Sequence, residues 1–135
     1  MSVLLSIKPK YVEEIKKKSK LFEFRKQIFK QFTNEIWVYE SAPTKRIVGK
    51  IIVSDIIKDS PKNLWRQTKQ VAGINKEDFF KYFEGKEEGY AIEIKDFYEL
   101  ESPLNPYEIE KDFVPPQSFA YLDNFIGMKK QLELA

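Results

Sequence analysis

The sequence predicts an α+β domain with a curled or barrel-like sheet. Segments rich in β-branched and aromatic residues follow one another without regular alternation of strand and helix, and helical segments are inserted among them. With 135 residues, the chain is expected to form one domain. The expected order is β-α-β-β-β-α-α-β, followed by an extended tail and a C-terminal helix.

The first half of the chain carries four strand patterns and one helix pattern. Val3–Ile7 is mostly apolar, as in a buried strand, and Pro9 suits the first turn of the helix that follows. A β-branched run at 46–57 predicts a long strand, and Gly49 inside it indicates a bulge or a close approach of another backbone. The other expected strands are 22–25 and 36–40, and residues 27–34 are expected to be irregular.

The second half begins with two helices that carry clear end signals. Ser60 is a typical N-cap with Pro61 at the first helical position, and Gly73 is a typical residue after a helix end. Asn75 caps the next helix, which Gly85 ends. Beyond them we expect a strand at 90–100, a loop marked by Pro103 and Pro106, an extended segment at 114–122 and a helix at 123–134.

The composition excludes several classes of chemistry. The chain has no cysteine and no histidine, which removes disulfides, Cys/His zinc sites and catalysis by Ser-His-Asp or Cys-His groups. Acid-base chemistry is left to Asp, Glu, Lys and Tyr, and we predict neither a metal nor a cofactor. No apolar run reaches the length of a membrane span, and the first residues lack the basic start of a secretory signal. We therefore expect a cytoplasmic protein without membrane contact.

The net charge of +2 conceals two oppositely charged segments. Residues 8–30 hold nine Lys or Arg and three Glu, a local charge of +6, whereas residues 84–112 hold ten Asp or Glu and three Lys, a local charge of −7. A basic segment interleaved with aromatic residues is compatible with phosphate contacts. The two segments could equally face each other within the fold, and composition alone leaves both interpretations open.

The strand at 22–25 carries the most informative polar pattern. Phe22 and Phe24 alternate with Glu23 and Arg25, so the two aromatic side chains point to one face and the two charges to the other. Lys20 lies just upstream, within reach of both charges. The three charged residues are either a binding site or an exposed ion pair of little energetic consequence.

The segment from Lys18 to Arg25 resembles the signature of the ASCH family, Gly-x-Lys-x-x-Glu-x-Arg. Lys20, Glu23 and Arg25 match its charged positions, whereas Lys18 stands where the family has glycine, so the turn before the strand is expected to differ. Further blocks resemble one branch of ASCH proteins, and the resemblance spans about residues 3–121. These blocks are Leu5–Pro9, Val48–Ile51, Ser60–Trp65, Tyr82–Gly85, Tyr90–Ile94 and Pro115–Phe119.

This resemblance implies a PUA-like β-barrel with helices at its rim, formed by residues 1–122, with 123–135 as a C-terminal helix or tail. It also implies a cleft beside the signature strand in which RNA or a modified nucleobase binds. Some ASCH proteins are amidohydrolases of acetylated cytidine and others cleave single-stranded RNA. In the amidohydrolases threonine occupies the position of Glu23, so the glutamate favours recognition over that reaction.

We therefore predict a nucleic-acid-binding module for RNA or a modified nucleobase, with DNA as an open alternative. Arg25 offers a planar fork, Lys20 a point charge, and Glu23 an acceptor for an exocyclic amine. The alternatives are an enzyme, in which Lys20 and Glu23 form the acid-base pair of a ribonuclease or amidohydrolase, and a transcription-related regulatory protein. The oligomeric state stays open. The predicted binding residues are Ser6, Lys8, Lys20, Glu23, Arg25, Ser41, Gln117, Ser118 and Tyr121.

Overall fold

The computed structural model describes residues 2–31 and 33–135. Its strands are β1 (Val3–Ile7), β2 (Phe22–Arg25), β3 (Glu35–Glu40), β4 (Arg46–Asp59), β5 (Gly89–Leu104) and β6 (Phe119–Tyr121). Its helices are α1 (Pro9–Lys16), α2 (Pro61–Thr68), α3 (Lys76–Tyr82), α4 (Pro106–Ile109) and α5 (Ile126–Glu133), with 3₁₀ turns at Lys69–Val71 and Leu122–Asn124.

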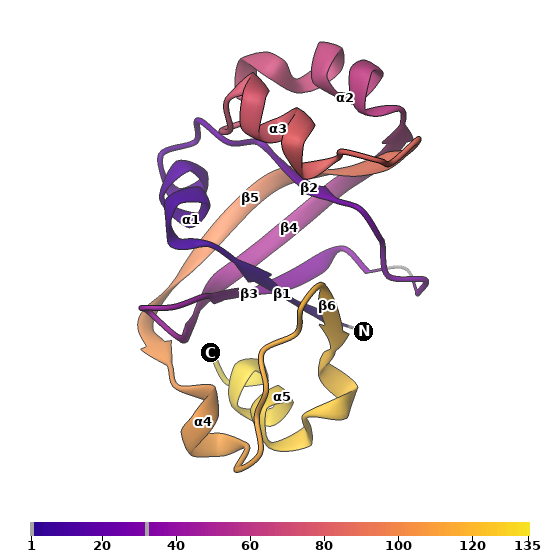
Figure 1. Cartoon of the computed structure of the whole chain (residues 1–135). Helices are drawn as coiled ribbons and strands as arrows, with labels where there is room; N and C mark the ends of the chain where they lie inside the picture. The colour runs from indigo at the N-terminus through magenta and orange to yellow at the C-terminus, as the bar shows by residue number, and fades with distance from the viewer. Residues whose placement is uncertain (1, 32) are drawn as a thin grey trace.

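The described strands form one mixed sheet in the order β2-β5-β4-β3-β1-β6. Only β1 and β3 pair in parallel; the other neighbours are antiparallel. The long strands β4 and β5 run diagonally through the molecule, with α2 and α3 at one end, α4 and α5 beyond the other, and α1 beside β5 (Figure 1). The sheet is a curled half-barrel with helices around it, which confirms the predicted fold class.

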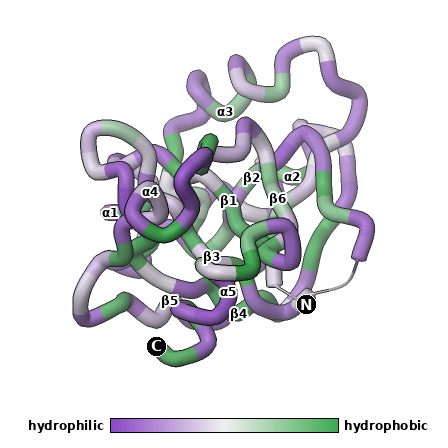
Figure 2. Tube along the Cα trace, turned by 90° about the horizontal axis from the view of Figure 1, so that it is seen from below, coloured by the Kyte–Doolittle hydropathy of each residue, from purple (hydrophilic) through white to green (hydrophobic). Residues whose placement is uncertain are grey.

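Alternation along the central strands divides the core into separate clusters. Val3, Leu5 and Ile7 point to the side of the sheet that α1 covers, whereas Leu4 points to the opposite side, where α5 packs. Seen from below, hydrophobic residues lie along the strands at the centre of the molecule and hydrophilic residues over much of the outer trace (Figure 2). A third cluster lies between β2 and the α2–α3 pair, where Phe24 packs edge-on against Phe79 with ring centroids 4.9 Å apart.

The expected glycine bulge is present. The pairing of β4 with β5 shifts register between Ile47 and Gly49, and a Cβ on Gly49 would lie 2.5 Å from the Phe97 ring. Only glycine allows this close approach of β4 to β5. The helix signals are also confirmed, because Ser60 and Asn75 accept hydrogen bonds from the backbone N–H groups of Asn63 and Asp78.

One expectation about the chain path is wrong. Pro103 lies inside β5 rather than in a loop, between the pairings Gly49↔Glu99 and Ile47↔Leu104. The β4–β5 pairing shifts register there, so no hydrogen bond between the two strands requires a backbone N–H from the proline. Pro106 does leave the sheet, as the first residue of α4.

The C-terminal segment forms a helix, as expected, but α5 begins at Ile126 after a 3₁₀ turn. Met128 and Leu132 are buried in the same cluster as Leu4, so α5 packs on the sheet. The division of the chain at residue 122 stays a prediction. Residues 27–34 contain no helix or strand in their described part, and Phe32 lies outside the described residues.

Candidate functional site

Strand β2 turns its two charged side chains away from the aromatic cluster. Because Phe22 and Phe24 pack against α2 and α3, Glu23 and Arg25 point to the opposite face. That face is not solvated: Glu23 is 6% exposed and Arg25 is 8% exposed. The interpretation of these residues as an exposed ion pair is therefore wrong.

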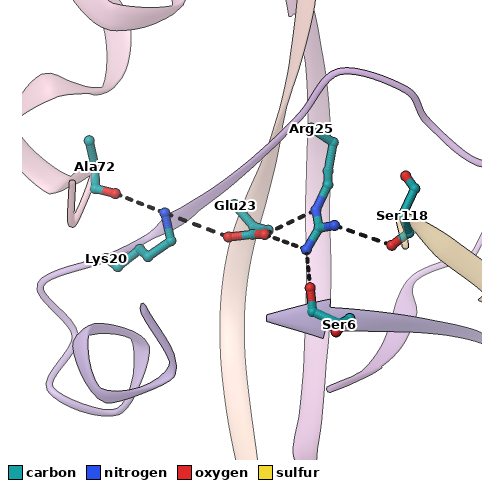
Figure 3. Close-up of polar contacts among 6 residues, drawn as sticks. All are labelled: Ser6, Lys20, Glu23, Arg25, Ala72 and Ser118. Carbon is teal, nitrogen blue, oxygen red and sulfur yellow. Dashed lines mark hydrogen bonds and ion pairs between the residues drawn. The ribbon is translucent and has the colours of Figure 1, made fainter. Parts of the chain in front are cut away.

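Arg25 is held by one side chain and two backbone carbonyls (Figure 3). Its Nε and Nη2 donate to Glu23 Oε2 at 3.0 and 2.7 Å. Nη2 also donates to the Ser6 carbonyl at 2.8 Å, and Nη1 donates to the Ser118 carbonyl at 3.2 Å. These contacts reach from β2, one edge of the sheet, to β1 and to the segment that enters β6. Arg25 therefore holds together the two sides of the open half-barrel.

Lys20 completes the buried charged cluster from the loop before β2. Its Nζ donates to the Ala72 carbonyl at 3.0 Å and lies 3.6 Å from Glu23 Oε1. Burial lowers the pKa of Lys20 below its ordinary value, although the neighbouring Glu23 carboxylate raises it. The cluster thus holds one carboxylate between two cationic groups.

Gly73 allows Lys20 to lie where it does. Gly73 has a φ of +65°, and a Cβ on it would lie 2.2 Å from Lys20 Cβ. Lys20 also forms an isolated bridge with Ala72, the preceding residue. The glycine predicted as a helix end therefore also makes room for a site residue.

A cavity of about 500 Å³ opens over this cluster. Lys20, Glu23 and Arg25 form part of its wall, and Tyr11 and Tyr82 contribute aromatic surface. The volume is in the range of small-molecule sites. The remaining lining residues are Ser6, Ile7, Lys8, Lys10, Phe24, Lys26, Ile74, Asp78, Lys81 and Gln117.

The structure brings six of the nine predicted site residues to the cavity: Ser6, Lys8, Lys20, Glu23, Arg25 and Gln117. Ser41, Ser118 and Tyr121 do not line it. Ser118 contributes its carbonyl to Arg25, and the Tyr121 hydroxyl accepts from the backbone N–H groups of Lys30 and Gln31. The Ser41 backbone N–H donates to the carbonyl of Ile7 in the turn after β3.

The cavity also contains residues that the sequence did not single out. Lys10 and Tyr11 come from α1, and Lys81 and Tyr82 come from the end of α3. The Nζ atoms of Lys10 and Lys20 lie 4.9 and 5.3 Å from the Tyr11 ring centroid, and that of Lys26 lies 4.7 Å from the Tyr82 ring centroid. Lys10 and Lys26 are exposed. The cavity thus has tyrosine walls and a basic rim.

Within residues 2–31 and 33–135, no group of three or more His, Cys, Asp or Glu side chains is placed to hold a metal ion.

In the same part of the chain, no helix is long and apolar enough to cross a membrane.

Comparison with known proteins decides the family. A model of the ASCH domain matches residues 5–112, which include β2 and most of the cavity wall. The chain belongs to the ASCH family. The family predicted from the Lys18–Arg25 segment is thereby confirmed.

The ASCH relatives include an ASCH domain-containing ribonuclease of Zymomonas mobilis. It is 28% identical over 126 residues, which cover 88% of this chain and 82% of the relative. Large ribosomal subunit protein uL22 of Ureaplasma parvum is 29% identical over 89 residues, but this ASCH chain covers only 28% of it.

Solved structures agree with this assignment. The crystal structure of ASCH from Zymomonas mobilis superimposes with a TM-score of 0.87 at 27% identity, over 98% of this chain and 94% of that one. The N-terminal domain of McrB from Staphylothermus marinus has a TM-score of 0.55 at 11% identity, over 96% and 93% of the two chains. The second similarity shows a shared fold only.

Proposed function

We propose that this ASCH domain binds RNA and takes an unpaired nucleobase into the cavity beside β2. The observation that carries the proposal is a cavity of about 500 Å³ with the buried Lys20–Glu23–Arg25 cluster in its wall and exposed lysines around it. Sequence-specific RNA recognition commonly takes unstacked bases into pockets of this kind. The relationship to a protein named as a ribonuclease supports RNA as the ligand class.

Each part of the cavity has a physical role in this proposal. The exposed Lys8, Lys10, Lys26 and Lys81 contact the phosphates that flank the bound base. Tyr11 and Tyr82 offer rings against which a base stacks, a contact worth roughly 1–3 kcal/mol per base. The buried cluster contacts the edge of the base.

The first experiment measures binding of short single-stranded RNA by fluorescence anisotropy as salt is raised from ~50 to ~200 mM. We expect affinity to fall with salt, and Lys10→Ala and Lys26→Ala to weaken binding and flatten that dependence. Lys95→Ala is the matched control, because Lys95 is exposed on β5 and does not line the cavity. Binding that is absent, or that Lys95→Ala weakens as much as Lys10→Ala, contradicts the proposal. DNA of the same sequence tests the role of the 2′-hydroxyl.

Cleavage of RNA is a second candidate function. A buried lysine whose pKa lies below its ordinary value, next to a carboxylate and open to a cavity, is a candidate general base. The Zymomonas relative is named as a ribonuclease, which also supports RNA cleavage as a candidate. Incubation of the parent protein and Lys20→Met with labelled RNA and with acetylated cytidine tests both reactions. RNA cleavage that Lys20→Met abolishes supports the ribonuclease.

Regulation through a protein partner is a third alternative, with α5 as its surface. Ile126 and Leu134 are exposed on and beside α5, whereas Met128 and Leu132 are buried in the core. Deletion of 123–135 would therefore disturb the core as well. Replacing Ile126 and Leu134 by Ser is the cleaner change, because it leaves the buried side unaltered.

A further inference from the structure

A second, smaller hollow adjoins the cavity. It has a volume of about 180 Å³, against roughly 300–1,000 Å³ for independent small-molecule sites, and it lies between α1 and residues 73–78. Four residues line both the hollow and the cavity, so the hollow continues the cavity rather than forming a site of its own. These shared residues are Lys10, Tyr11, Ile74 and Asp78, and the rest of the hollow is lined by Glu14, Gly73 and Asn75.

Helix α1 leads from the cavity into the hollow. Tyr11 and Glu14 are three residues apart on α1 and therefore lie on the same face of the helix, one turn from each other. The Tyr11 ring centroid lies 5.3 Å from Lys20 Nζ, which belongs to the cavity wall, whereas Glu14 lines the hollow alone. A ligand that extends beyond the cavity can thus follow this face of α1.

The charge of the hollow differs from that of the cavity rim. The rim carries several exposed lysines, whereas the hollow has one lysine, Lys10, against the carboxylates of Glu14 and Asp78. A phosphate inside the hollow would face two negative groups and would be repelled by them. A neutral base meets no such repulsion, and it can contact the Tyr11 ring and the Ile74 side chain.

Lys10 lies where the cavity and the hollow meet. It is exposed, its Nζ lies 4.9 Å from the Tyr11 ring centroid, and no ion pair joins it to a carboxylate of the described residues. Asp78 also lines both spaces, but its Oδ2 accepts from the Asn75 side chain at 3.1 Å at the start of α3. Lys10 is therefore the cation at this junction that can neutralise a phosphate.

We propose that the hollow is a subsite for the nucleotide next to the one in the cavity, so that the domain binds two consecutive nucleotides of single-stranded RNA. One base enters the cavity, its neighbour lies in the hollow, and the phosphate that joins them lies at Lys10. The inference rests on the proposed function, because it extends the same site. Since the second nucleotide is tethered to the first, its contacts add affinity without the cost of a separate association.

The first test varies the ligand and leaves the protein intact. Adenosine 3′-monophosphate, adenosine 5′-monophosphate and the dinucleotide ApA compete with labelled single-stranded RNA for the parent protein. Both mononucleotides are included because either nucleotide of the pair can occupy the cavity. We expect ApA to bind at least ~10-fold more tightly than either mononucleotide. ApA with a neutral methylphosphonate linkage should bind more weakly than ApA itself, because it lacks the charge that Lys10 neutralises.

The second test changes the protein at the hollow and at the junction. Glu14→Trp fills the hollow and should remove the advantage of ApA over the mononucleotides. Glu13→Trp is the matched control, because Glu13 is exposed on the same helix and lines neither space, and it should keep that advantage. In Lys10→Ala, ApA and its methylphosphonate analogue should bind with nearly equal affinity.

The outcomes separate this inference from the proposed function. ApA that binds no more tightly than the mononucleotides, or ApA that fails to compete while longer RNA binds, overturns the two-nucleotide site and leaves RNA binding in place. An advantage of ApA that Glu14→Trp retains, or a linkage effect that Lys10→Ala retains, overturns the assignment of the hollow or of the junction. Failure of the labelled RNA itself to bind overturns the proposed function.

Discussion

The Arg25 guanidinium on β2 donates a hydrogen bond of 2.8 Å to the backbone carbonyl of Ser6 on β1. Because β2 ends the sheet on one side and β1 lies next to its other end, this contact crosses the opening of the half-barrel. The pairing of β1 with β6 stops at Leu5, so the Ser6 carbonyl is available to the arginine. The same residue thus shapes the cavity and holds the sheet in its curled form.

Arg25→Met should destabilise the fold strongly. Among the described residues it leaves the buried Glu23 carboxylate with Lys20 as its one ion-pair partner, and removing one partner of a buried ion pair typically costs about 3–5 kcal/mol. Chemical denaturation of parent and variant measures this loss. Lys16→Met is the control: its ion pair with Glu99 is at the surface, and such pairs contribute about 0–1 kcal/mol. Equal losses for the two variants would contradict the structural role of Arg25.

Gly73→Ala should destabilise the protein and displace Lys20. A Cβ at Gly73 would lie 2.2 Å from Lys20 Cβ, and the positive φ adds strain of about 1–2 kcal/mol. Gly85→Ala isolates the cost of the backbone conformation, because Gly85 also has a positive φ but, among the described residues other than its chain neighbours, no atom lies within 4 Å of its added Cβ. We expect thermal unfolding to show a larger loss for Gly73→Ala, and only that variant to weaken RNA binding. A loss no greater than that of Gly85→Ala would mean that Lys20 adjusts freely.

The stabilisation by Lys20 should depend on pH in the alkaline range. Burial lowers its folded-state pKa below the ordinary value of 10.5, so between the two pKa values the unfolded chain binds more protons. Stability therefore rises with pH through that window and levels off near 10.5. We expect the difference in unfolding free energy between parent and Lys20→Met to shift in favour of the parent as pH approaches that value.

Lys16→Met serves as the control for this titration. Hydrogen bonding to Glu99 raises the pKa of Lys16 above 10.5, so its contribution is fully present below that pH and is lost only above it. Below pH 10.5, the difference in unfolding free energy between the parent and Lys16→Met should thus stay constant, whereas the difference between the parent and Lys20→Met changes. A constant difference for both variants would show that Lys20 is charged throughout the window.

Much of the fold follows from local patterns in the sequence. The caps at Ser60 and Asn75 accept from backbone N–H groups three residues further on, so the local sequence is enough to predict them. Gly49 predicts a bulge, but the strand that approaches it, β5, lies far along the chain. The loop predicted at Pro103 is wrong because β5 accommodates this proline at a register shift in its pairing with β4. That shift depends on how two distant strands pair, which the local sequence does not show.

The candidate site was predictable only in part. Alternation in β2 places Glu23 and Arg25 on one face, but their burial depends on partners far along the chain. The carbonyls that hold Arg25 belong to Ser6 and Ser118, and the one that holds Lys20 belongs to Ala72, 52 residues away. The tyrosines that line the cavity lie on two helices whose packing the sequence alone does not define.

The location of the bound RNA tests the central claim most directly. Backbone amide signals of the isotope-labelled protein are assigned, and their shifts are followed by NMR as single-stranded oligouridine is added. The account predicts the largest shifts around the cavity, at β2 and at the segments carrying Lys10, Tyr11 and Tyr82. Shifts confined to α5, or to the exposed face of β5 around Lys95, would contradict it.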